Sequence, residues 1–176
     1  MSFFASYSPS GIAAAPSGSI VFQAAHGGSS RIGAIAPDGT GRRTLTPDGV
    51  EARDPLVARG TGRIVYTAQG TDRVNHAWTI DPEGGTPTQL TRGDGESAAT
   101  VSPDGRWFIF RHESSLNFWK ADVGGGEPTK VGPASTGVMF PPQCSPNGRY
   151  ILFWTFRGGG VWRGGFEQVR AEGGPP

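Results

Sequence analysis

A repeat of about 43 residues constrains the fold of this 176-residue chain more than any other feature. Segments that open with a turn and run into an apolar stretch recur four times, and the positions inside them keep the same spacing. Three series mark the repeat: Gly18, Gly62, Gly105 and Gly148; Phe22, Tyr66, Phe110 and Phe153; and Trp78, Trp119 and Trp162. A fold made of equivalent structural units in a row is therefore expected.

The length and content of the repeat predict a β-propeller. About 43 residues is the length of one four-stranded blade, and each copy holds four short runs of β-branched and aromatic residues. The chain's 29 glycines and 15 prolines disfavour helices and suit the tight turns between strands. We predict an all-β propeller of four four-stranded antiparallel blades, either closed on itself or part of a larger propeller.

The repeats also predict how the chain is divided. We expect an N-terminal segment, 1–10, that could add a closing strand to the last blade, and a C-terminal tail, 171–176. Between them, 11–170 form the four blades, at about 11–48, 53–92, 97–133 and 139–170. In the last blade we expect a third strand at 160–163 and an outer strand at 166–170. Aromatic residues of the second and third strands should fill the space between adjacent blades.

Two turn-and-strand segments carry a family resemblance. Ser102–Phe110 (SPDGRWFIF) and Ser145–Phe153 (SPNGRYILF) resemble the core of the WD40-like repeats in TolB-type propellers, and Asp81–Thr91 (DPEGGTPTQLT) resembles the stretch that follows it. The resemblance covers about residues 11 to 170. It implies a propeller of a family that is often periplasmic and that includes the gating propellers of peptidases. Such propellers usually have six or more blades, whereas this chain has four repeats.

Charge and terminal sequence exclude several classes of partner. The net charge is +1, and Arg42-Arg43 is too short a basic run, so no nucleic-acid partner is expected. No run of about 18 apolar residues exists, so no membrane insertion is expected. Met1–Tyr7 lacks the pattern of a signal peptide. The single cysteine, Cys144, forms no internal disulfide, and the cellular compartment stays open.

The histidines do not form a recognisable metal motif. His26 and His112 follow the second strands of repeats 1 and 3, so they could lie on one propeller face, with Asp72 and Glu113 nearby in sequence. The short ligand spacing of a zinc site is absent. We therefore predict loop histidines and no metal, and His76 has no separate role in this interpretation.

Other residues that suggest chemistry fit structural roles better. Ser29 and Ser30 resemble a hairpin tip, and Cys144 a small buried core residue. Equivalent positions in successive blades favour core packing over ligand stacking for the tryptophans of the repeat. The glycine-rich and Asp-Gly pieces are expected to form turns rather than phosphate or calcium loops: Gly124–Gly126, Gly158–Gly160, Asp38-Gly39 and Asp48-Gly49.

These observations predict a non-catalytic module without a cofactor. A rigid propeller with variable loops suits binding or scaffolding of a protein or peptide partner. Two alternatives remain open at this point. The chain could be the gating propeller part of a serine peptidase, or a structural subunit whose open blades are completed by copies of itself or by a larger assembly.

Overall fold

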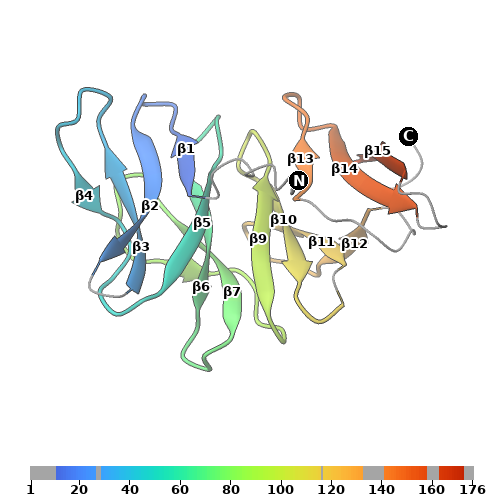
Figure 1. The fold of residues 1–176 in the computed structure, drawn as a ribbon, viewed down its shortest axis with the longest axis horizontal. Coiled ribbons are helices and arrows are strands. Elements are labelled where there is room, and N and C mark those ends of the chain that lie inside the picture. Colours follow the sequence, from blue (N-terminus) through green and yellow to red (C-terminus); the bar gives the residue numbers. More distant parts are fainter. Residues whose placement is uncertain (1–10, 27–28, 116, 133–140, 158–162, 173–176) are drawn as a thin grey trace, which may run out of the picture.

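The computed structural model describes residues 11–26, 29–115, 117–132, 141–157 and 163–172. Within these ranges every regular element is a β-strand, and the strands form four separate antiparallel sheets (Figure 1). No helix suited to crossing a membrane occurs in this part of the chain. The all-β prediction is confirmed.

Each sheet is one repeat, and its strands lie side by side in chain order from the inside of the molecule outward. The first sheet holds β1 (Ile12–Ala14), β2 (Ile20–His26), β3 (Ser29–Ile35) and β4 (Arg43–Thr44), and the second β5 (Ala52–Val57), β6 (Ile64–Gln69), β7 (Asn75–Ile80) and β8 (Thr88–Gln89). The third sheet holds β9 (Glu96–Val101), β10 (Trp107–His112), β11 (Phe118–Asp122) and β12 (Thr129–Val131), and the fourth β13 (Gln143–Cys144), β14 (Tyr150–Arg157) and β15 (Arg163–Arg170). We call these sheets blades 1 to 4.

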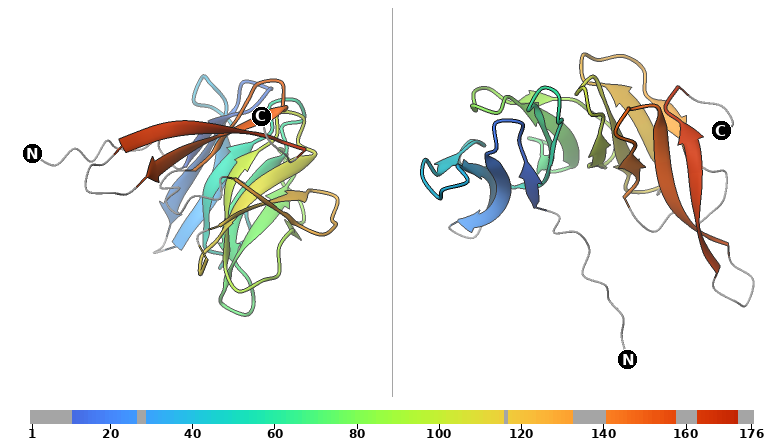
Figure 2. Two further views of the ribbon diagram at one scale, coloured as in Figure 1. Left: turned by 90° about the vertical axis from the view of Figure 1, so that its right-hand side faces the viewer. Right: turned by 90° about the horizontal axis from the view of Figure 1, so that it is seen from above.

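The four blades stand in an arc (Figure 2). Each packs on the next, and the first and last blades do not meet across the described residues. The closed four-blade alternative is therefore wrong, and the arrangement is that of an open propeller. Residues 1–10, which we expected to supply a closing strand, lie outside the described part of the chain.

Three apolar clusters join the blades, one at each junction. Strand residues alternate between the two faces of a sheet, so each blade offers one set of side chains to each neighbour. Tyr66 packs toward blade 1, Phe108 toward blade 2 and Phe153 toward blade 3, and all three are almost completely buried. The prediction that aromatic residues fill the space between blades is confirmed for these junctions.

The fourth blade differs from the prediction. We expected an outer strand at 166–170, but these residues belong to β15 and pair directly with β14, with Phe166 opposite Trp154 and Arg170 opposite Tyr150. The cause is the length of β14, because its eight residues continue the ladder through Gly164 and Gly165, which we had aligned with a turn. Of the expected third strand at 160–163, residues 160–162 lie outside the described residues.

The Ser-Pro-x-Gly turn explains its own residue pattern. In blade 3 the Ser102 hydroxyl donates to Asp104 at 2.7 Å and accepts from the Trp107 backbone N–H at 3.1 Å. Asp104 also accepts from the Arg106 N–H at 3.1 Å, and Gly105 has a φ of 71°. Each polar group of the tight turn thus has a partner, which fixes the register of the hairpin that follows.

Blade 4 repeats this arrangement with asparagine in place of aspartate. The Ser145 hydroxyl donates to Asn147 at 2.8 Å and accepts from the Tyr150 N–H at 2.9 Å. Only the carboxyl or amide oxygen is needed, so either residue serves at this position.

In blades 1 and 2 a Leu-Thr pair directly follows the outer strand and bonds it to the third strand. The Thr91 hydroxyl accepts a hydrogen bond from the buried Ala77 N–H at 2.9 Å, and the Thr46 hydroxyl accepts one from the Ile32 N–H at 3.2 Å. The preceding residue, Leu45 or Leu90, donates its own N–H to the same third strand. Threonine thereby satisfies a backbone donor that the short outer strand leaves without a ladder partner.

We expect Gly105→Ala to destabilise the protein more than Gly39→Ala. Both glycines have positive φ, 71° and 84°, which costs an alanine about 1 kcal/mol. At Gly105 the new Cβ would also lie 2.6 Å from the Thr61 hydroxyl and 3.0 Å from Ala58, whereas nothing lies within 4 Å at Gly39. Overpacking should add about 1 kcal/mol at Gly105. Urea denaturation measures both variants, and equal losses would contradict the packing argument.

Candidate functional site

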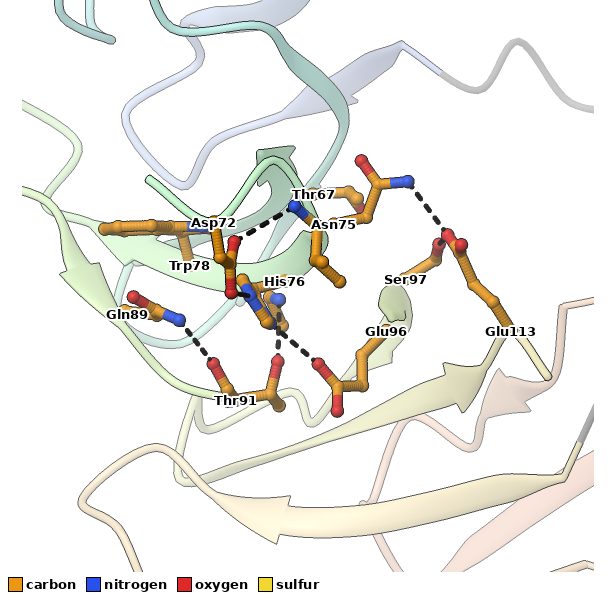
Figure 3. A network of polar contacts seen from close by, with 12 residues as sticks. Thr67, Asp72, Asn75, His76, Trp78, Gln89, Thr91, Glu96, Ser97 and Glu113 are labelled. Carbon is orange, nitrogen blue, oxygen red and sulfur yellow. Dashed lines mark hydrogen bonds and ion pairs between the residues drawn. The ribbon is translucent and has the colours of Figure 1, made fainter. Parts of the chain in front are cut away.

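The most buried ionisable cluster of the described residues lies between blades 2 and 3. His76 is the second residue of β7 and has no exposed surface. Asp72 lies in the hairpin that leads into β7, and Glu96 is the first residue of β9 in the next blade. The third strand of one blade and the inner strand of the next thus place the three side chains together (Figure 3).

His76 is held by a carboxylate on each ring nitrogen. Its Nδ1 lies 2.9 Å from a Glu96 oxygen and its Nε2 lies 2.9 Å from an Asp72 oxygen. Glu96 is 4% exposed at its side chain, whereas Asp72 is 54% exposed. The imidazole therefore bridges one buried and one partly solvated carboxylate.

This geometry favours the protonated imidazole. Burial alone lowers the pKa of His76, but the hydrogen bonds to Asp72 and Glu96 and their charges outweigh it, so the pKa lies above its usual value. The Val74 backbone N–H and then His76 hold the pKa of Asp72 below its usual range. A protonated histidine with both nitrogens occupied has no lone pair to offer as a base or a metal ligand. The cluster acts as a polar joint between blades 2 and 3.

A second polar group lies beside this joint and is more exposed. Glu113 accepts hydrogen bonds from the Asn75 amide at 3.0 Å and the Ser97 hydroxyl at 2.9 Å, and Arg53 lies 3.7 Å away. Asn75 lies in β7, Ser97 in β9 and Arg53 in β5, and Glu113 lies in the hairpin after β10; Figure 3 shows Glu113 with Asn75 and Ser97. Glu113 thus has partners already, as does Asp72, and the described residues contain no group of three suited to holding a metal ion.

We expect the contribution of His76 to stability to fall as the pH rises. Because its folded pKa is raised, the stabilisation is complete below about pH 6.5, the usual value in an unfolded chain, and is lost as the pH passes the folded pKa. The difference in Tm between the wild type and His76→Asn should therefore narrow as the pH is raised from about 6.5 through the folded pKa of His76. Thr86→Ala, at an exposed side chain of blade 2 that does not titrate, serves as a control whose difference from the wild type should stay constant with pH. A constant gap for His76→Asn would contradict the raised pKa.

Of the two histidines that we considered for a common site, the structure describes the side chain of His112 alone. His26 is the last residue of β2, and its side chain lies outside the described part. His112 is the last residue of β10, and its Nδ1 lies 3.0 Å from the hydroxyl of Ser114 in the exposed hairpin. No carboxylate is hydrogen-bonded to His112 in the described contacts, so Ser114 and His112 lack the acid that orients the histidine of a catalytic triad.

The other candidate nucleophiles also have structural environments. Cys144 ends β13 and is partly rather than fully buried; burial, and then the charge of Asp104, raise the pKa of its thiol to about 11. The reactive thiolate is therefore scarce at neutral pH. Ser29 and Ser30, which we expected at a hairpin tip, are the first residues of β3, and Ser30 accepts a hydrogen bond from Gln23 at 2.9 Å.

The tryptophan series belongs to the core wherever it is described. Trp78 packs on the cluster between blades 1 and 2, and Trp119 on the cluster between blades 2 and 3. Trp162 lies outside the described residues. The interpretation as core packing is confirmed for the first two.

The glycine-rich and Asp-Gly pieces form turns where they are described. Gly125 and Gly126 have positive φ in the connection from β11 to β12, and Asp38 accepts two hydrogen bonds from Thr40 next to Gly39. Asp48 forms an ion pair with Arg31. Gly158–Gly160 lies outside the described residues.

The two end faces of the arc are the remaining candidate surfaces. Three large apolar side chains are exposed among the described residues: Ile12 and Ile20 at 59% and 37%, and Leu152 at 38%. Ile12 and Ile20 belong to blade 1 and Leu152 to blade 4. By strand alternation they lie on the faces opposite to those that pack inside the arc. Each terminal blade therefore presents a partly apolar face that no described residue of the chain covers.

Comparison with known proteins supports the fold. No model of a known protein family matches the chain. An uncharacterised protein of Agrobacterium fabrum is 30% identical over 88 residues, which make up 48% of this chain and 30% of that protein. The structure of TolB from Acinetobacter baumannii superposes with a TM-score of 0.71 and 23% identity, over 93% of this chain and 41% of that one.

Two further structures show how widely this arrangement is used. A putative TolB from Agrobacterium tumefaciens gives a TM-score of 0.75 and 21% identity, over 93% of this chain and 62% of that one. A puromycin hydrolase superposes with a TM-score of 0.69 and 14% identity, over 90% of this chain and 26% of that one. The chain thus has the blade architecture of TolB-type propellers, as its sequence predicted, and spans less than two thirds of each of these proteins.

Proposed function

We propose that this chain is a non-catalytic binding and scaffold module that engages a protein partner through the end faces of its arc. The observation that carries the proposal is the pair of uncovered, partly apolar faces, with Ile12 and Ile20 on one and Leu152 on the other. In the three junctions inside the arc, the corresponding faces are buried against a neighbouring blade. A partner that covers an end face would bury apolar surface in the same way.

The surroundings of the ionisable groups support a role without catalysis. His76 has both nitrogens occupied, the thiol of Cys144 has a raised pKa, and His112 contacts only a neighbouring serine in its own hairpin. None of these groups is arranged as an activated nucleophile or a free base.

Differential capture tests the proposal. The immobilised wild-type chain, Ile20→Asp, Leu152→Asp and the control Thr86→Asp, which lies in an exposed loop of blade 2, are presented to the same cell extract. Proteins retained by the wild type and the control but lost with a face variant are purified and mixed again with each variant. Equal retention by all four chains, or none by the wild type, would contradict the proposal.

A second candidate function is the propeller part of a hydrolase. The similarity to puromycin hydrolase, of which this chain covers 26%, favours it. In that case the reading frame continues into an α/β-hydrolase pattern, and sequencing the surrounding gene decides the point. A third candidate, a subunit that completes its arc with copies of itself, requires an oligomer, so light scattering on the purified chain tests it.

A further inference from the structure

Blade 1 departs from the repeat at two positions that lie close together in the fold. The residue opposite the closing aromatic is Trp78 in blade 2 and Trp119 in blade 3, but Gly33 in blade 1. Nine residues further along, where blades 2 and 3 have Pro87 and Pro128, blade 1 has Arg42. A large apolar side chain is thus lost and a cation gained on the same blade.

The exchange leaves a hollow on the end face of blade 1. It is shallow and open to solvent, has a volume of about 40 Å³, and is lined by residues that include Phe22, Ala24, Arg31, Gly33, Arg42 and Thr44. The Arg42 guanidinium lies over the Phe22 ring at 5.4 Å from its centre. A Cβ at position 33 would meet Phe22 and the Arg43 carbonyl oxygen at 3.0 Å, so glycine is required for this packing.

The arginine side chains of the hollow are not all paired with acidic residues of the described part of the chain. Arg31 is paired with Asp48, but its Nε is buried with no hydrogen-bond partner among the described residues. Arg42 has a contact with Phe22 and no acidic partner in the same part of the chain. The exposed Arg42 guanidinium therefore remains available to an anion, whereas the Arg31 Nε is too buried to be reached directly.

Two arginines at junctions inside the arc have the acidic partner that Arg42 lacks among the described residues. Arg43 of blade 1 meets Glu83 of blade 2 at 3.2 Å, and Arg53 of blade 2 lies 3.7 Å from Glu113 of blade 3. At these two junctions a cation of one blade faces a carboxylate of the next, and between blades 3 and 4 Lys120 donates to the Ala171 carbonyl oxygen at 2.8 Å. Arg42 occupies a face on which no described blade supplies that carboxylate.

We propose that the hollow of blade 1 receives an aspartate or glutamate side chain of the protein partner that covers this face. The inference rests on the proposed function and specifies the chemistry of the partner. Ile12 and Ile20 lie on the same face, so the fitting surface carries a carboxylate flanked by apolar side chains. Guanidinium groups bind carboxylates through paired hydrogen bonds, and the aromatic ring holds Arg42 in place.

A second copy of this chain does not fit this requirement. The exposed Arg170 lies opposite Tyr150 on the sheet face that also carries Leu152, so the described end face of blade 4 presents a cation. The partner is therefore a different protein with an acidic side chain at this position.

The test uses a capped pentapeptide of sequence VTETV, in which the glutamate and both valines share one face of an extended strand. NMR of the full chain follows the arginine Nε–H signals and the Phe22 ring during titration. The neutral peptide VTQTV and inorganic phosphate are titrated in parallel. Arg42→Gln tests the hollow, and Arg106→Gln, at an exposed hairpin of blade 3, is the control.

VTETV is expected to shift the Arg42 and Phe22 signals while VTQTV does not. Arg42→Gln should weaken this binding at least about tenfold, and Arg106→Gln should leave it unchanged. Equal responses to both peptides, no response to VTETV, or an unaffected Arg42→Gln variant would overturn the inference. Tighter binding of phosphate would also overturn it, because the hollow would then be a small-anion site. If the inference fails while Ile20→Asp still abolishes partner capture, the proposed function survives alone.

Discussion

Replacing His76 with leucine is expected to lower the free energy of unfolding by about 3–5 kcal/mol. The substitution removes the partner of Glu96, whose side chain is 4% exposed, and leaves a carboxylate buried without compensation. Asp72 is 54% exposed and can regain water, so most of the loss should come from the Glu96 side. Urea denaturation followed by tryptophan fluorescence measures the change.

A double variant separates the charge from the packing. In His76→Leu with Glu96→Leu, no charge is left buried, so the double variant should be more stable than His76→Leu alone. His112→Leu, at a partly exposed histidine of blade 3, is the matched control and should cost less than about 1 kcal/mol. A His76→Leu variant as stable as the control would show that the joint contributes little to the native state.

The second large effect is expected in the series of closing aromatics. Phe153 is completely buried between blades 3 and 4, and Phe153→Ala should lower the free energy of unfolding by about 3–5 kcal/mol. Phe22 occupies the same position of the repeat in blade 1, but its face is uncovered, so Phe22→Ala should cost only about 1 kcal/mol. The same denaturation experiment measures both.

This pair of variants also tests the arc itself. The two phenylalanines hold the same place in the repeat but have different cross-strand neighbours, Gly33 for Phe22 and Glu167 for Phe153, and only Phe153 has a further blade against it. Equal losses would mean that the face of blade 1 is covered in solution, either by another part of the protein or by another copy. The comparison therefore reports on the open end without any knowledge of the partner.

Local sequence signals were sufficient to predict the blades. Turn residues such as Gly105 and the alternation around Phe108 act over a few residues, so the prediction of four antiparallel strands per blade is confirmed for blades 1 to 3. In blade 4 the glycines at 164 and 165 resembled a turn, and only the length of the partner strand keeps them in β15. Ladder pairing overrode the local signal there.

The polar joint was missed because it depends on contacts between blades. Asp72 and His76 are close in sequence, but Glu96 is 20 residues further along and belongs to the next blade. Strand parity gave no signal for it, because His76 shares the parity of Trp78, which packs toward blade 1, whereas Glu96 belongs to blade 3. The hollow of blade 1 was visible only as a glycine in a tryptophan series, and its meaning required the register of the sheet.

The short outer strands have a consequence for behaviour at high concentration. Unpaired strand edges are where β-proteins recruit one another into fibrils. In blades 1 to 3 the outermost strands have only two or three residues, so their rims offer little backbone to an incoming strand. The edge of blade 4 is β15, with eight residues. Among the outer rims of the described blades, fibril growth by strand addition should therefore start at the edge of blade 4.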